Sequence, residues 1–155
     1  MRKTVWIVVA FLLACATSFS ADNFQPLNVK TGLWEVTEHM TAQGLPPAMA
    51  ALVNHTSTYK TCITPEQLKE NPFSDDKCKW SLIQSNSSDM EVKGTDCNSG
   101  KKEGMSTTIH YKLHAVDSEH VNGSGDWTAT GQGQTMSGAV NGSGHWAASS
   151  CGNVR

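Results

Sequence analysis

The chain has 155 residues, of which 38% are hydrophobic and 17% are charged, and its formal charge at pH 7 is −2. This length suits one domain and leaves little room for a second. The hydrophobic content excludes a wholly disordered chain, and a charge so near zero argues against a nucleic-acid-binding protein.

The first twenty residues have the three-part layout of a secretory signal peptide. Arg2 and Lys3 give a positive start, an apolar run follows over 5–16, and a small-x-small triplet stands at 18–20. The apolar run has about 12 residues, whereas a membrane-spanning helix needs roughly 20. No other segment is apolar enough to span a membrane. We therefore expect residues 1–20 to be removed on export to the periplasm or the extracellular space.

A second processing route starts from Cys15. The sequence Leu-Leu-Ala-Cys at 12–15 resembles a bacterial lipobox, whose cysteine becomes a lipid anchor. Either route removes Arg2 and Lys3 and takes Cys15 out of the folded domain. After signal-peptide cleavage the chain keeps about 135 residues. These include 10 basic and 14 acidic side chains, a formal charge of −4.

Residues 21–31 contain a proline and predict an extended lead-in to a single β-rich domain over 32–155. At the start of this domain, apolar side chains alternate with polar ones. Trp34, Val36 and Met40 share one parity, which predicts a half-buried strand.

Two short helices and a strand are expected next. Residues 48–53 are apolar and predict a short helix or a mobile flap, and residues 58–63 are rich in strand formers. The sequence Thr-Pro-Glu-Gln at 64–67 combines an N-cap threonine, a proline at the first helical position and a glutamine three residues after the cap. This pattern predicts a helix over 65–70.

Four cysteines remain in the mature chain, and an even number in an exported protein predicts two disulfides. They are Cys62, Cys78, Cys97 and Cys151. Three pairings are possible. We favour Cys62–Cys78, since this pair brackets a compact segment, and Cys97 then pairs with Cys151. A four-cysteine zinc site needs closely spaced ligand pairs, which spacings of 16, 19 and 54 residues do not provide.

The second half of the chain is expected to be β-structure. Alternation predicts strands over 77–82, 90–97 and 105–116. The sequence Val-Asn-Gly-Ser-Gly-Asp-Trp at 121–127 recurs at 140–146 with six of seven positions identical. Low-complexity disorder is one interpretation of this repeat. A final hairpin of two twisted strands, tied back by the last cysteine, is the better supported one.

The predicted fold is therefore mainly β. We expect an antiparallel curved sheet or a small barrel of six or seven strands, with one or two short helices and two disulfide staples.

Two motifs resemble a known family. Gly-Leu-Trp-Glu-Val-Thr stands at 32–37 after the proline-containing lead-in, and Cys-Ile-Thr-Pro-Glu-Gln stands at 62–67. With two further cysteines and the final Cys151, they resemble the exported bacterial family named domain of unknown function 3617, from residue 26 to residue 151. The resemblance implies a periplasmic or surface location. It implies no activity.

The tryptophans of the mature chain are the candidate ligand-binding residues. They either fill the core or line a concave aromatic surface that binds a lipid, a sugar or a peptide. A curved sheet with an apolar mouth, covered by residues 48–53, would form such a site. The four residues are Trp34, Trp80, Trp127 and Trp146.

No sequence motif indicates a catalytic, cofactor or metal site. The G-x-S-x-G frame, the P-loop lysine and the dinucleotide fingerprint are missing from the sequence. A soft metal site built from His39, Met40, Met49 and His55 would require separate loops to converge. We expect no bound cofactor and no nucleic-acid partner.

The sequence thus predicts an exported, non-catalytic domain that binds a small apolar ligand or has a structural role. The alternative is an inhibitor-like envelope protein that binds another protein. A small hydrolase or a metal carrier is less favoured.

Overall fold

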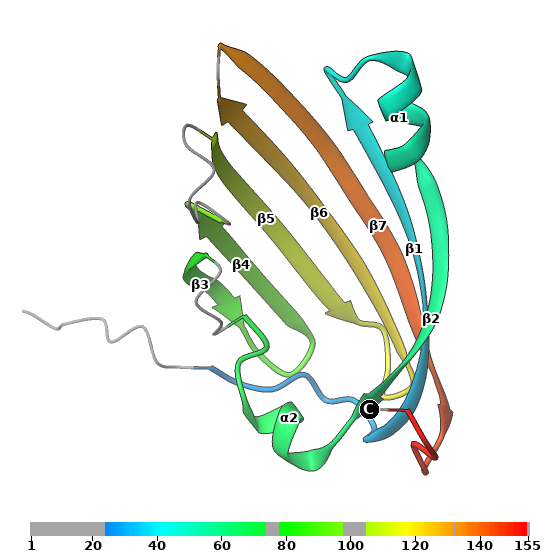
Figure 1. Cartoon of the computed structure of the whole chain (residues 1–155). Coiled ribbons are helices and arrows are strands. Elements are labelled where there is room, and N and C mark those ends of the chain that lie inside the picture. The colour runs from blue at the N-terminus through cyan, green and yellow to red at the C-terminus, as the bar shows by residue number, and fades with distance from the viewer. Residues whose placement is uncertain (1–23, 74–77, 98–104, 132, 155) are drawn as a thin grey trace, which may run out of the picture.

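One antiparallel sheet of seven strands makes up most of the described structure (Figure 1). The computed structural model describes residues 24–73, 78–97, 105–131 and 133–154. The expected signal peptide and Cys15 lie outside this part of the chain. Among the described residues, no helix is both long enough and apolar enough to cross a membrane.

Strands that follow one another in the chain pair antiparallel, except for β2 and β3, and the first strand also pairs antiparallel with the last. Their order across the sheet is β2-β1-β7-β6-β5-β4-β3. The sheet is curved and open, with β2 and β3 at its two edges (Figure 1), so the curved-sheet prediction is confirmed and the sheet does not close into a barrel. The strands are β1 (Gly32–Gln43), β2 (His55–Ile63), β3 (Lys79–Ser85), β4 (Asp89–Thr95), β5 (Met105–Ala115), β6 (His120–Gly131) and β7 (Gln134–Ala148).

The sheet has a concave, mostly apolar face and a convex, mostly polar face. Residues directly opposite each other on antiparallel strands share a face. Val36 of β1 lies opposite Gly144 of β7, and Tyr111 of β5 lies opposite Val92 of β4. The alternation of Trp34 and Val36 with polar residues therefore assigned the face of β1 correctly. Val92 is 1% exposed and belongs to the buried cluster, together with Leu27, Met90 and Ala115.

The lead-in before β1 closes one end of the concave face. The backbone N–H of Asn28 donates to the carbonyl oxygen of Ser87 at 2.7 Å, and that of Lys30 donates to Ser118 at 2.8 Å. These bonds hold the lead-in across the turns of two hairpins, as Figure 1 shows at the lower end of the sheet. Leu27 thereby packs into the same buried cluster as Val92.

Both predicted helices are present. The helix α1 (Pro47–Val53) contacts β1, and α2 (Pro65–Lys69) follows β2. At the start of α2, the hydroxyl of Thr64 accepts a hydrogen bond from the backbone N–H of Gln67 at 3.2 Å. The side-chain oxygen of Gln67 accepts the backbone N–H of Thr64 at 2.9 Å. The predicted capping box is confirmed.

The disulfide pairing favoured from the sequence is wrong. The bonds join Cys62 to Cys151 and Cys78 to Cys97. Since β2 and β3 are opposite edges of the sheet, Cys62 at the end of β2 is remote from Cys78 at the start of β3. Cys78 and Cys97 instead lie just beyond the paired ends of the β3–β4 hairpin, with their Cα atoms 4.0 Å apart.

Candidate ligand-binding cavity

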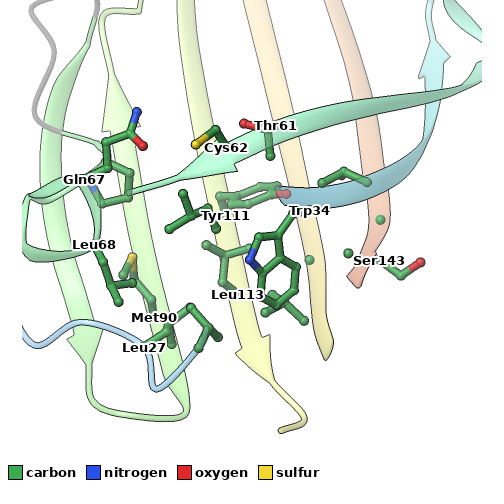
Figure 2. Close-up of a pocket in the computed structure, with 18 of the residues that line it drawn as sticks. Leu27, Trp34, Thr61, Cys62, Gln67, Leu68, Met90, Tyr111, Leu113 and Ser143 are labelled. Carbon is green, nitrogen blue, oxygen red and sulfur yellow. The ribbon is translucent and has the colours of Figure 1, made fainter. Parts of the chain in front are cut away.

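A cavity of about 660 Å³ lies on the concave face, between the two halves of the curved sheet (Figure 2). The connection from β2 to β3 passes from one edge of the sheet to the other, and α2 in this connection covers the cavity together with the lead-in (Figure 1). The volume falls within the range of small-molecule sites. Its apolar wall is formed by Phe24, Leu27, Val29, Trp34, Val36, Ile63, Leu68, Met90, Leu113 and Val121.

The floor of the cavity comes from the glycine repeat. The β6–β7 hairpin confirms the interpretation of this repeat, and its register places Gly123 directly opposite Gly142. A Cβ atom on Gly123 would lie 2.6 Å from the hydroxyl of Tyr111, and one on Gly142 would lie 3.1 Å from Cγ of Glu38. The paired glycines therefore form a trough that leaves room for both side chains. This trough accounts for the glycines of the repeat, and the polar residues between them point to the opposite face of the sheet.

One part of the cavity wall is polar and is formed by Glu38, Tyr59 and Tyr111. The hydroxyl of Tyr59 donates a hydrogen bond to a carboxylate oxygen of Glu38 at 3.1 Å. Tyr111 is half-buried, and this burial, followed by the nearby charge of Glu38, raises the pKa of its phenol. The three side chains, from β1, β2 and β5, thus face one another across the glycine trough.

Tyr59 provides a test of this arrangement. Partial burial and then the neighbouring Glu38 carboxylate raise the pKa of Tyr59 to about 12. Because the folded chain holds this proton more tightly than the unfolded chain, the resulting stability is fully present below pH 10 and is lost as the pH rises through about 12. A titration of tyrosinate absorbance is expected to show no ionisation midpoint near 10. Replacing Tyr59 by phenylalanine should remove part of the absorbance change, and a wild-type midpoint near 10 would contradict the geometry.

The electrostatic character of the cavity is acidic. Among the described residues that line it, two carry charge, and both are carboxylates, Glu38 and Glu70. The same part of the lining contains no lysine, arginine or histidine. Cys62 belongs to the lining but is disulfide-bonded, so it supplies no free thiol.

Of the four candidate tryptophans, Trp34 is the one that lines the cavity. Its side chain projects into the centre of the site in Figure 2 and is only 2% exposed overall. Its indole N–H donates to the carbonyl oxygen of Lys30 at 2.9 Å. This bond fixes the ring between the sheet and the lead-in.

The other three tryptophans lie outside the cavity lining. Trp80 packs against Phe73, with ring centroids 5.2 Å apart. Trp127 lies over Gly138, and Trp146 donates its indole N–H to the carbonyl oxygen of Thr31 at 3.0 Å. The structure therefore does not gather the four tryptophans into one aromatic surface.

The segment expected to cover the site lies elsewhere. Residues 48–53 belong to α1, which lies beside the other end of β1 (Figure 1), and the cavity lining includes none of its described side chains. Sequence reasoning missed Glu38 and Tyr59 as site residues. One signal was present: Glu38 has the same parity as Trp34 and Val36, so it is a carboxylate at a position that faces the apolar side.

His39 and His55, which were considered for a metal site, each contact a different polar group of the protein. A ring nitrogen of His39 lies 3.0 Å from the hydroxyl of Thr56, and one of His55 lies 2.9 Å from the carbonyl oxygen of Val53. Within the described part of the chain, no three histidine, cysteine or acidic side chains are grouped as metal ligands.

Comparison with known proteins gives one match. Residues 29–151 match the family model described as "Protein of unknown function (DUF3617)". Neither a curated protein nor a solved structure matches the chain.

Proposed function

The chain belongs to the DUF3617 family, and we propose that it is an exported, non-catalytic protein that binds a small apolar ligand in the cavity on its concave face. The observation that carries this proposal is the cavity of about 660 Å³ with ten apolar side chains in its wall. Burying apolar ligand surface against such a wall supplies about 0.8 kcal/mol for each methylene group. The sheet, α2 and the lead-in form this wall together.

Two further observations support the proposal. The two disulfides are typical of proteins that fold in an oxidising, exported environment, here the periplasm or the extracellular space. The described lining holds aliphatic hydroxyls, phenols, amides and carboxylates but no histidine and no free cysteine, so no imidazole base stands beside the hydroxyls of Thr61 and Ser143. The alternative is that the exported chain is anchored by a lipid on Cys15.

Ligand binding can be tested with the purified mature chain and the fluorescent probe N-phenyl-1-naphthylamine. We expect saturable binding of the probe and its displacement by straight-chain alcohols. The dissociation constant of each alcohol should fall by up to about fourfold per added methylene until the cavity is full. Absence of saturable binding by both probe and alcohols would overturn the proposed function.

A cavity-filling variant locates the site. Leu68 of α2 points into the cavity (Figure 2), whereas its neighbour Lys69 is exposed. Replacing Leu68 by tryptophan is expected to weaken probe binding roughly tenfold, since the larger ring occupies apolar space that the ligand would fill. Replacing Lys69 by tryptophan adds the same ring outside the cavity and should leave binding unchanged. Equal binding by both variants would place the ligand elsewhere.

A further inference from the structure

We propose that the cavity selects an amphiphile whose polar group is a positively charged ammonium, and that Glu38, Tyr59 and Tyr111 receive this group. The inference rests on the proposed function and specifies the class of ligand. The apolar tail occupies the space between Trp34 and Leu113, and the ammonium lies beside the carboxylate of Glu38.

Glu38 is the negative charge that the β1 strand presents to the cavity. The other carboxylate of this strand, Glu35, has the opposite parity and lies 3.8 Å from the ammonium of Lys60. Glu38 accepts the hydroxyl of Tyr59, and no basic side chain of the described residues pairs with it. Its negative charge therefore has no protein counterion in that part of the structure.

The two tyrosines complete a site suited to a cation. Cations are attracted to the faces of aromatic rings, and quaternary ammonium groups are bound in this way in cages of aromatic side chains. The ring of Tyr111 lies against Gly125 and its hydroxyl end lies over Gly123, which is directly opposite Gly142 beneath Glu38. Opposite residues on antiparallel strands have Cα atoms about 5 Å apart. The hydroxyl end of the Tyr111 ring and the Glu38 side chain thus approach the same part of the cavity, where one small cation can contact both.

The same features oppose an anionic ligand. A fatty acid would bring its carboxylate into a cavity whose described lining carries Glu38 and Glu70 and no basic residue. Like charges repel more strongly in a partly desolvated cavity than in water. Binding of an acid would therefore be weaker than binding of an uncharged molecule with the same tail.

The test compares three compounds that share one tail. Decyltrimethylammonium, decanol and decanoate are each used below their micelle concentrations to displace N-phenyl-1-naphthylamine from the wild-type chain at pH 7.5. We expect decyltrimethylammonium to bind roughly tenfold more tightly than decanol, and decanoate to bind most weakly. Because the three compounds have the same tail length, the differences in their affinities report the effect of the polar group.

A matched pair of variants distinguishes the effect of the local Glu38 charge on binding from the effect of the protein's net charge. Glu38→Gln keeps the shape and an acceptor for the Tyr59 hydroxyl, and it should abolish the advantage of decyltrimethylammonium while leaving decanol unchanged. Glu35→Gln removes the same charge from the convex face and should leave the order of the three compounds as in the wild type. Equal loss of ammonium binding in both variants would show a general charge effect and overturn the inference.

The wild-type series also distinguishes this inference from the proposed function. If decanoate binds as tightly as decyltrimethylammonium, the ammonium preference is refuted, while apolar binding stands. If the probe itself does not bind and none of the three compounds competes with it, the proposed function fails together with the ammonium preference.

Discussion

Replacing Cys62 and Cys151 together by alanine is expected to lower the free energy of unfolding by about 4 kcal/mol, the largest effect predicted for this chain. The two residues are 89 positions apart in the sequence, so their bond restricts a long loop of the unfolded chain. The same bond ties the end of the edge strand β2 to the segment that follows β7. Loss of the bond should therefore also loosen the edge of the cavity that β2 forms.

Urea unfolding of the oxidised proteins measures this effect. The matched comparison is the double replacement of Cys78 and Cys97, whose bond spans 19 positions. This bond closes a shorter loop, so its loss should lower the free energy of unfolding by about 3 kcal/mol. Probe binding should weaken more in the Cys62/Cys151 variant, because Cys62 belongs to the cavity lining. Unfolding curves of the Cys62/Cys151 variant that coincide with the wild type would contradict the observed pairing.

Replacing Gly138 by alanine is expected to lower the free energy of unfolding by about 3 kcal/mol, the second largest effect predicted here. Gly138 of β7 lies opposite Trp127 of β6 and opposite Ala42 of β1. A Cβ atom at this position would lie 2.6 Å from the ring of Trp127 and would overlap the carbonyl oxygen of Thr41. Because one of these obstacles is backbone, a change of rotamer cannot relieve the collision.

Gly144 is the control for this prediction. It lies on the same strand and the same face, but its Cβ would meet Trp34 and Val36 at 3.5 and 3.6 Å, which is ordinary contact. Replacing Gly144 by alanine should change stability by less than about 1 kcal/mol. Thermal unfolding of both variants gives the comparison. Similar melting temperatures for the two would contradict the packing of Trp127 over Gly138.

Local features were predictable from the sequence because short-range patterns determine them. The alternation around Trp34 identified both a strand and its buried face. The Thr-Pro-Glu-Gln pattern identified α2 through a capping box that involves only Thr64 and Gln67. The repeat identified the final hairpin, since its glycines could form two adjacent twisted strands.

The candidate site was only partly predictable. Trp34 was identified as a candidate and lies in the cavity, but Trp80, Trp127 and Trp146 do not. A tryptophan at a buried strand position can pack against a neighbouring strand or face a cavity, and alternation alone does not distinguish these outcomes. Glu38 was missed because its role depends on Tyr59 and Tyr111, which come from other strands.

The sequence by itself determined the strands, the two helices, the polar and apolar faces and the presence of four cysteines that can form two disulfides. The tertiary structure alone decided which cysteines pair and where a cavity forms. Both depend on the order of strands in the sheet, which places β1 beside β7 and puts β2 and β3 at opposite edges. Strand order is set by contacts between residues far apart in the chain, such as Gly138 with Thr41, and no local pattern encodes them.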